Sequence, residues 1–279
     1  MTRDEWLRAS GIERADALVL LRELAGVSRA ALLAHPEAEL DAARLEALER
    51  AAEALRGGLP LAYVLGWREF YGLRLELNRH VLIPRPDTEL LVEFALRRID
   101  PRHAAEVLDL GTGSGAIAIA IAHERPLARV HGADLSAEAL ELARRNAERL
   151  LPPERPGGAA RWHLGDWMQA LAPGAGDFDL IVSNPPYVAE ADPHLAALRH
   201  EPALALVGAR ACADGLGDIR VLVAQAAPRL RAGAWLALEH GYDQAAAVRA
   251  LLQGAGLLEV HSLRDLAGIE RVTAGRAGQ

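Results

Sequence analysis

From about Ala105 to the C-terminus, short apolar runs alternate with longer segments of helical periodicity. This alternation is typical of a parallel sheet whose strands are joined by crossover helices. We expect seven strands, at residues 105–110, 128–134, 160–166, 178–184, 234–240, 257–263 and 270–276. Helices are expected at 115–124, 136–151, 218–230 and 242–256. The last two strands leave no room for a helix, so we expect the sheet to end in an antiparallel pair.

The residues before this region follow a different pattern. Helical periodicity predicts helices at 4–9, 13–26 and 38–58, the last two ending at glycines. Aromatic and alternating apolar residues around Gly72 then predict a hairpin of two short strands. We therefore expect three parts: an N-terminal helical domain (1–66) that binds substrate, a β-hairpin connector (67–80) and a catalytic domain (81–279).

Composition excludes several classes of protein. The 279 residues are 51% hydrophobic and 25% charged, as in folded globular proteins. Acidic residues interrupt the N-terminus and no apolar stretch reaches membrane-spanning length, so we expect a cytoplasmic protein that binds no membrane. The lone Cys212 forms no internal disulfide, and we expect no metal. A net charge of −7 argues against direct binding of nucleic acid.

A glycine-rich turn follows the first strand of the predicted sheet. In DLGTGSGA (109–116) the glycines allow tight turns and close approach of a ligand to the backbone. The motif fits both dinucleotide-binding enzymes and enzymes that use S-adenosylmethionine. Asp134 ends the next strand, where a carboxylate would hold ribose hydroxyls. The pair therefore predicts a ligand that contains adenosine.

Asp166 and Trp167 follow the third predicted strand. There the Asp166 carboxylate would accept from the adenine amino group, and the Trp167 ring would form a wall against the base. These two residues reach the same edge of the sheet as the glycine turn, which strengthens the prediction of an adenosine ligand.

NPPY (184–187) follows the fourth predicted strand. The two prolines fix the backbone and remove two N–H donors, so the Pro185 carbonyl and the Asn184 side-chain oxygen are free to accept hydrogen bonds. Tyr187 adds a flat wall. Together these groups suit a planar NH₂ group, and holding both its hydrogens would align the nitrogen with a sulfonium methyl. The motif therefore favours S-adenosylmethionine over a dinucleotide.

With these motifs, the chain resembles the HemK/PrmC family, whose members methylate the glutamine of the GGQ motif in class 1 peptide-chain release factors. The resemblance spans roughly residues 60–272. It is carried by YVLGWREFYGLRLELNRHVLIPRPDTE (63–89), EPALAL (201–206), DGL (214–216), LEHGYDQ (238–244) and RDLAGIERV (264–272), besides the glycine turn and NPPY.

The resemblance implies a site. Cofactor-binding positions would be Gly111, Thr112, Gly113, Ser114, Gly115, Asp134, Asp166, Trp167 and Asn184. The glycine turn would wrap the methionine part of the cofactor, with Asp134 on the ribose and Trp167 near the adenine. Asn184 and the Pro185 carbonyl would be catalytic, orienting the substrate amide. Pro186 and Tyr187 would complete the substrate pocket. Residues 83–89 would line its entrance, where Arg85 would meet the substrate loop or the cofactor carboxylate, or else cap the following helix from the surface.

Two positions depart from the family pattern. Asp87 stands where the family more often has glutamate, and we expect it to be the N-cap of the next helix. GARACADGL (208–216) is longer than usual around Cys212 but contains no predicted site residue. His240 is not expected to act as a general base, because a methylated amide loses its proton to water.

The sequence therefore predicts an α/β protein: a seven-stranded, Rossmann-like S-adenosylmethionine-dependent methyltransferase domain, with a small N-terminal helical domain and a hairpin connector. The resemblance implies class 1 release factors as substrates. Two alternatives stay open. NPPY also suits an adenine amino methyltransferase acting on DNA or RNA, and an inactive S-adenosylmethionine-binding sensor would keep the same turn.

Overall fold

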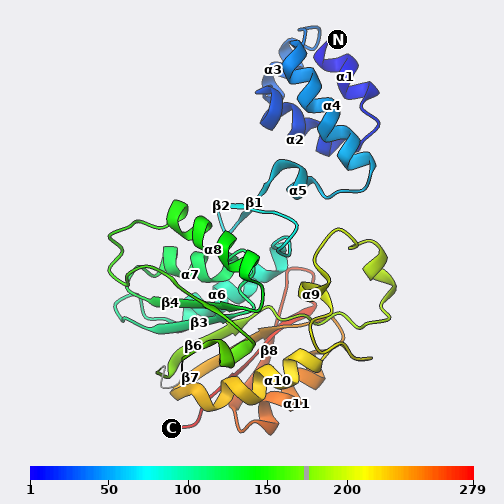
Figure 1. The fold of residues 1–279 in the computed structure, drawn as a ribbon. Helices are drawn as coiled ribbons and strands as arrows, with labels where there is room; N and C mark the ends of the chain where they lie inside the picture. Colours follow the sequence, from blue (N-terminus) through cyan, green and yellow to red (C-terminus); the bar gives the residue numbers. More distant parts are fainter. Residues whose placement is uncertain (173–175) are drawn as a thin grey trace. The chain divides into compact units, whose positions relative to one another are not determined.

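The structure of the chain is a computed structural model that describes residues 1–172 and 176–279. The chain forms two compact units, Met1–Trp67 and Arg68–Gln279. Each has its own apolar core. Figure 1 shows the helical first unit in blue and the sheet-containing second unit in the remaining colours.

The first unit contains five helices in its described residues: α1 (Arg3–Ala9), α2 (Arg14–Ala25), α3 (Arg29–Ala34), α4 (Ala42–Arg56) and α5 (Leu61–Leu65). Trp6, Leu20 and Leu48 are fully buried at its centre. The three predicted helices are confirmed as α1, α2 and α4, whereas α3 and α5 were not predicted. These two are only six and five residues long, too short for a periodic pattern to stand out.

The second unit begins with the predicted hairpin. Strands β1 (Trp67–Phe70) and β2 (Leu73–Glu76) pair in a two-stranded sheet. A 3₁₀ turn, η1 (Pro86–Thr88), leads into α6 (Glu89–Arg98). The prediction that Asp87 caps α6 is wrong: Thr88 occupies the N-cap position, without a side-chain cap bond. The chain is already helical at Asp87, and its carboxylate faces Arg271 at 3.6 Å.

The predicted seven-stranded sheet is confirmed. Its strands are β3 (Glu106–Leu110), β4 (Arg129–Asp134), β5 (Arg161–Leu164), β6 (Phe178–Ser183), β7 (Leu230–Glu239), β8 (Leu258–Arg264) and β9 (Glu270–Arg276). They lie in the order β5-β4-β3-β6-β7-β9-β8. The first five are parallel, and β9 pairs antiparallel with both β7 and β8. The strand order reverses between β3 and β6, so their carboxyl ends open a crevice between two diverging connections.

Helices cover both faces of this sheet (Figure 1). The predicted helices between strands are confirmed as α7 (Ala116–Glu124), α8 (Ala137–Leu150), α10 (Gly217–Ala226) and α11 (Ala245–Gly254). One face packs against α6 and α7, the other against α10 and α11. Alternate residues of one strand serve the two cores, as Val107 and Leu108 do. Shorter helical segments are η2 (Trp167–Ala170), η3 (Pro193–Ala196), α9 (Ala203–Leu206) and η4 (Ala227–Arg229).

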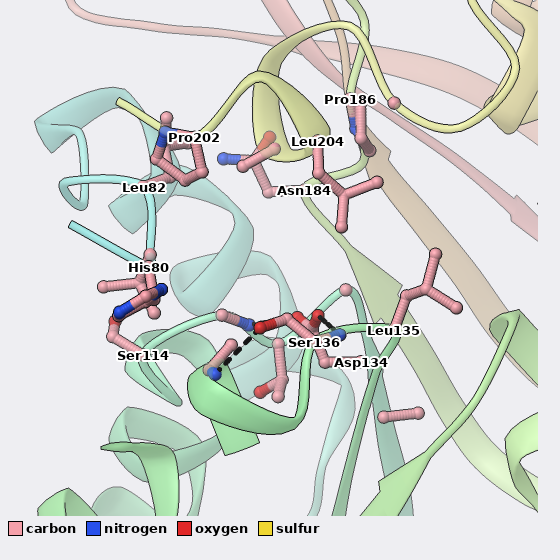
Figure 2. Close-up of a pocket in the computed structure, with 18 of the residues that line it drawn as sticks. His80, Leu82, Ser114, Asp134, Leu135, Ser136, Asn184, Pro186, Pro202 and Leu204 are labelled. Carbon is pink, nitrogen blue, oxygen red and sulfur yellow. Dashed lines mark hydrogen bonds between the residues drawn. The ribbon is translucent and has the colours of Figure 1, made fainter. Parts of the chain in front are cut away.

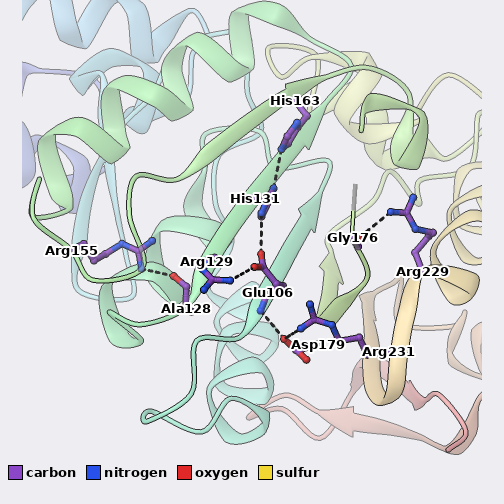
Figure 3. Close-up of polar contacts among 10 residues, drawn as sticks. All are labelled: Glu106, Ala128, Arg129, His131, Arg155, His163, Gly176, Asp179, Arg229 and Arg231. Atoms are coloured by element: carbon purple, nitrogen blue, oxygen red, sulfur yellow. Dashed lines mark hydrogen bonds and ion pairs between the residues drawn. The ribbon is translucent and has the colours of Figure 1, made fainter. Parts of the chain in front are cut away.

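Polar contacts tie β3, β4 and β5 together (Figure 3). Glu106 on β3 accepts from Arg129 at 2.6 Å and lies 3.3 Å from His131 on β4. The other ring nitrogen of His131 lies 3.0 Å from His163 on β5, and the two rings stack. The contact between Glu106 and Arg129 lies at the amino ends of β3 and β4, whereas His163 is level with Ala133 near the carboxyl end of β4.

Candidate active site

A cavity of about 230 Å³ occupies the crevice at the carboxyl ends of the strands. Its lining comes from the segments that follow β2, β3, β4, β5 and β6. The lining residues are Arg79–Leu82, Pro84, Thr88, Gly111–Ser114, Ala116, Ile117, Ala133–Ser136, Ala139, Gly165–Trp167, Asn184, Pro186, Pro202, Leu204, Ala205, Gly208–Arg210 and Asp218. Figure 2 shows Asn184 near Pro202 and Leu204 on one side, with Asp134 and Ser136 on the other.

The glycine turn forms one wall of the cavity. Gly111, Gly113 and Gly115 have φ angles of 71°, 55° and 83°, a region that L side chains rarely adopt. The backbone N–H groups of Gly111 and Thr112 both donate to the Ala133 carbonyl, which ties the turn to the end of β4. A Cβ at Gly111 would lie 3.3 Å from the Trp167 ring. The missing side chain therefore leaves a narrow space between backbone and aromatic ring.

Asp134 lies where β4 ends, as predicted, and its carboxylate holds the neighbouring backbone. Its Oδ2 accepts from Gly113 N–H at 2.8 Å, and its Oδ1 accepts from Ser136 N–H at 2.9 Å. Burial raises the pKa of Asp134, and these backbone donors act against that rise. Each carboxylate oxygen has further lone pairs, so Asp134 can accept from ligand hydroxyls while it shapes the turn.

Asp166 and Trp167 both line the cavity. The Asp166 carboxylate forms a two-pronged ion pair with Arg210, which sequence analysis missed. Arg210 also bonds Asp218 at 2.8 Å, and the indole N–H of Trp167 donates to Asp218 at 3.3 Å. Arg210 and Asp218, which lie on either side of Cys212 in sequence, thus hold the predicted adenine-binding pair in place. No local sequence motif reveals these contacts.

Of the NPPY segment, Asn184 and Pro186 line the cavity, whereas Pro185 and Tyr187 are absent from the described lining. The Nδ2 of Asn184 donates to the Thr88 hydroxyl at 3.2 Å. Within the described part of the chain, its Oδ1 accepts no hydrogen bond. Ser183, just before, donates to the Leu110 carbonyl at 2.5 Å and so joins the end of β6 to that of β3.

Tyr187 points away from the cavity toward β7. Its hydroxyl donates to Oε1 of Glu239 at 3.2 Å. Burial, together with the neighbouring Glu239, raises the pKa of the tyrosine above its ordinary value. Tyr187 is therefore a donor to a buried carboxyl and does not line the described cavity.

Arg85 is engaged by a buried acid. Its guanidinium lies 2.5 Å from Oε1 of Glu201, whose other oxygen accepts from Ile83 N–H at 3.0 Å. Arg85 itself is absent from the described lining, although Pro84 and Pro202 belong to it. The Glu201 carboxylate thus joins residues 83–85 to the segment that begins at Pro202. Both segments border the cavity, through Pro84 and Pro202.

Besides Arg210, two more residues near the site escaped sequence analysis. Thr88 lies in the segment expected at the entrance and is 3% exposed, but its contact with Asn184 depends on the fold. Glu239 ends β7 and is 2% exposed. Burial raises its pKa to about 7. The neighbouring His240 is also buried, with its ring nitrogens on Gly241 and Thr273, and is absent from the described lining.

The described residues contain neither a metal-binding cluster nor a membrane-spanning helix. No group of three or more His, Cys, Asp or Glu side chains in residues 1–172 and 176–279 is arranged to hold a metal ion. Across the same residues, no helix has the length and apolar character needed to span a membrane.

Family comparisons cover most of the chain. Residues 5–66 match the PrmC N-terminal domain, and residues 87–206 match the methyltransferase small domain. The release factor glutamine methyltransferase of Burkholderia pseudomallei is 51% identical over 278 residues, covering 99% of this chain and 96% of that protein. The protein of the same name from Bordetella pertussis is 49% identical over 267 residues, covering 95% of each.

Among solved structures, a methyltransferase from Pyrococcus furiosus aligns with a TM-score of 0.54 at 20% identity. The alignment covers 82% of this chain and 98% of that one. At this identity the likeness concerns the fold alone.

Proposed function

The chain belongs to the release factor glutamine methyltransferase family, and from this premise we propose that it methylates a protein glutamine. The acceptor is the side-chain amide nitrogen of the glutamine in the GGQ motif of class 1 release factors. The methyl donor is S-adenosylmethionine. Roles for individual residues follow from the geometry of the cavity.

The cavity residues fit an adenosine ligand with a charged amino acid tail. The space that Gly111 leaves beside Trp167 suits close approach of a ligand to the backbone. Asp134 offers lone pairs to ribose hydroxyls, and the Asp166 and Trp167 pair borders the place for an aromatic base. When bound, S-adenosylmethionine supplies a methyl group activated by its sulfonium. Residues 111–115 hold its methionine part.

A single observation carries the assignment of the amide site. Asn184 lies in the cavity wall with its Nδ2 committed to Thr88, which leaves Oδ1 as an acceptor for an amide hydrogen of the substrate. The Pro185 carbonyl is the second acceptor. Holding both hydrogens aligns the otherwise weakly nucleophilic nitrogen for in-line attack. A nitrogen–carbon bond forms as the carbon–sulfur bond breaks, and the extra amide proton leaves to water.

The N-terminal domain, residues 1–66, is assigned to binding a second part of the release factor. This assignment rests on its match to the PrmC N-terminal domain and on its independent core. The hairpin, residues 67–80, connects it to the catalytic domain, residues 81–279. Because the substrates are translation factors, the enzyme works in the cytoplasm.

The proposal is tested by transfer of radiolabelled methyl from S-adenosylmethionine to a purified class 1 release factor. A release factor with GGA in place of GGQ and a duplex DNA serve as parallel acceptors. Label on the GGQ protein alone is expected. Label on DNA alone would instead identify an adenine methyltransferase and overturn the proposal.

Asn184→Ala tests the acceptor role in the same assay. We expect kcat to fall by at least about 100-fold, because the variant loses an acceptor that orients the nucleophile. The Kd for S-adenosylmethionine should change by less than about threefold. Gln253→Ala, which removes an exposed amide from α11, is the matched control. Full activity of Asn184→Ala would contradict the assigned role.

A further inference from the structure

Arg210 lines the cavity, yet the proposed reaction gives it no task. It lies in GARACADGL (208–216), the segment whose length departs from the family pattern. Its guanidinium forms a two-pronged ion pair with Asp166, in which Nη1 donates to Oδ1 at 3.2 Å and Nη2 donates to Oδ2. One rigid, planar group therefore bonds both oxygens of Asp166, which fixes the orientation of the carboxylate.

Asp218 holds Arg210 in turn. This acid lies in the first turn of α10 and is 3% exposed. Its Oδ1 accepts from Nη1 of Arg210 at 2.8 Å, and its Oδ2 accepts from the backbone N–H of Arg210 at 3.1 Å. Gly208 lies so close to the acid that a Cβ there would stand 1.9 Å from Oδ2. Arg210 is thus held through both its backbone and its side chain.

The same buried acid fixes the aromatic wall of the cavity. The indole N–H of Trp167 donates to Oδ1 of Asp218 at 3.3 Å. Trp167 has a φ of 49°, a conformation that bulky residues rarely adopt, so its backbone needs an anchor from outside the segment. Asp166 and Trp167, which are adjacent in the chain, are therefore both held by the pair of Arg210 and Asp218.

A carboxylate held in this way distinguishes purines by the group at C6. An ionised carboxylate accepts hydrogen bonds and cannot donate them. Each oxygen of Asp166 keeps a further lone pair beside its bond to Arg210, so it can accept from the 6-amino group of adenine, and it repels the 6-oxo group of hypoxanthine. A carboxylate that was free to rotate could turn instead to the N1–H of hypoxanthine. Discrimination therefore depends on the fixed orientation of Asp166.

We propose that Arg210 is a positioning residue that, by fixing the Asp166 carboxylate, makes the cavity select an adenosine ligand over its inosine counterpart. This inference rests on the adenosine cofactor of the proposed function. The segment 208–216, in which the sequence indicated no site residue, thereby contributes one.

The test measures, by calorimetry, how the full-length protein binds S-adenosylhomocysteine and S-inosylhomocysteine, which carry adenine and hypoxanthine respectively. We expect the wild type to bind the adenine compound at least about 30-fold more tightly. Arg210→Ala should reduce this ratio of Kd values at least about fivefold, because the Asp166 carboxylate is released. Arg210→Lys keeps the charge but cannot bond two oxygens in one plane, so its ratio should fall as well.

Arg220→Ala is the matched control. Arg220 forms an ion pair with Asp214 in the same segment and lies outside the described lining of the cavity. Both Kd values of this variant should stay within about twofold of wild type, since its ion pair is exposed.

The ratio separates positioning from mere support of the fold. A substitution that only loosened the segment would weaken the binding of both compounds by the same factor, and an unchanged or larger ratio in Arg210→Ala would overturn the inference. Equal binding of the two compounds by the wild type would also overturn it. If Arg210→Ala does not fold, the ratio for Arg210→Lys decides alone. Binding of neither compound to the wild type would instead refute the adenosine cofactor of the proposed function, and this inference with it.

Discussion

At the scale of single residues, Asp134 performs two tasks with one carboxylate. Its oxygens hold Gly113 and Ser136 through their N–H groups, and its side chain borders the cavity. The acid therefore shapes the turn proposed to receive the cofactor, before any ligand contact is made. Removing it should affect cofactor binding first and the chemical step second.

We predict that Asp134→Ala raises the Kd for S-adenosylmethionine at least tenfold, a loss of about 1.4 kcal/mol. At saturating cofactor, kcat should fall less than the affinity does, since the amide site on the other side of the cavity is intact. Calorimetry and steady-state kinetics measure the two quantities. An unchanged Kd would move the ribose contact to another residue.

Residues with a local signature were predictable at this scale, and residues defined by distant partners were not. The positions of the glycine turn, Asp134, Trp167 and Asn184 at the cavity followed from strand ends and motifs. Thr88 and Asn184 are 96 residues apart, so no short motif joins them. Likewise, the role of Arg85 was predicted from its neighbours in sequence, whereas its ion-pair partner Glu201 lies 116 residues away.

At the scale of elements, Asn146 on α8 holds the hairpin against the glycine turn. Its Nδ2 donates to the carbonyls of Glu76 and Ser114 at 3.1 and 3.0 Å. Its Oδ1 accepts from Glu76 N–H at 2.7 Å. The side chain is fully buried, so these bonds have no replacement from water. One amide thus connects β2, α8 and the turn.

We predict that Asn146→Ala destabilises the protein by about 2 kcal/mol, because buried backbone groups of Glu76 and Ser114 lose their partners. The melting temperature should fall by roughly 4 to 8 °C. Asn146→Asp keeps the acceptor for Glu76 N–H but loses both donated bonds, so it should also destabilise. Calorimetric unfolding measures both variants, and a melting temperature within 1 °C of wild type, roughly the effect of a neutral surface change, would contradict the assigned connection.

Elements also differ in how far the sequence predicts them. All seven strands of the sheet were predictable because each is an apolar run between turn residues. The short helices α3 and α5 and the 3₁₀ turn at Pro86–Thr88 were not. In α3 the Ser28 side chain accepts from Ala31 N–H, as an N-cap residue does. In the sequence, one capping residue before so short a helix does not distinguish the helix from a loop.

At the scale of the whole molecule, the pair His131 and His163 affects how stability depends on pH. Burial lowers the pKa of both rings, and the His131 charge further lowers that of His163. The folded state therefore binds fewer protons than the unfolded chain just below the ordinary histidine pKa of 6.5. Their contribution to stability is present above pH 6.5 and is lost as the pH falls below it.

We predict that the wild type loses more stability between pH 7.5 and pH 5.5 than a His131→Asn, His163→Asn double variant does. Asp109 and Glu239, whose raised pKa values act in the opposite sense, are present in both proteins and cancel in the comparison. Urea unfolding at the two pH values measures the difference. The exposed His123→Asn serves as control and should follow wild type. Parallel behaviour of the double variant and wild type would exclude this titration.

The hydrogen bond from Tyr187, in the NPPY segment, to Glu239 at the end of β7 has a consequence for folding. The two residues are 52 positions apart in sequence. Contacts of such high sequence separation form only after the intervening chain has been ordered. During synthesis, the NPPY segment therefore gains this contact only once β7 has emerged and joined the sheet. Nascent fragments that lack this strand should be unable to carry out the reaction, so catalytic competence reports completion of the fold.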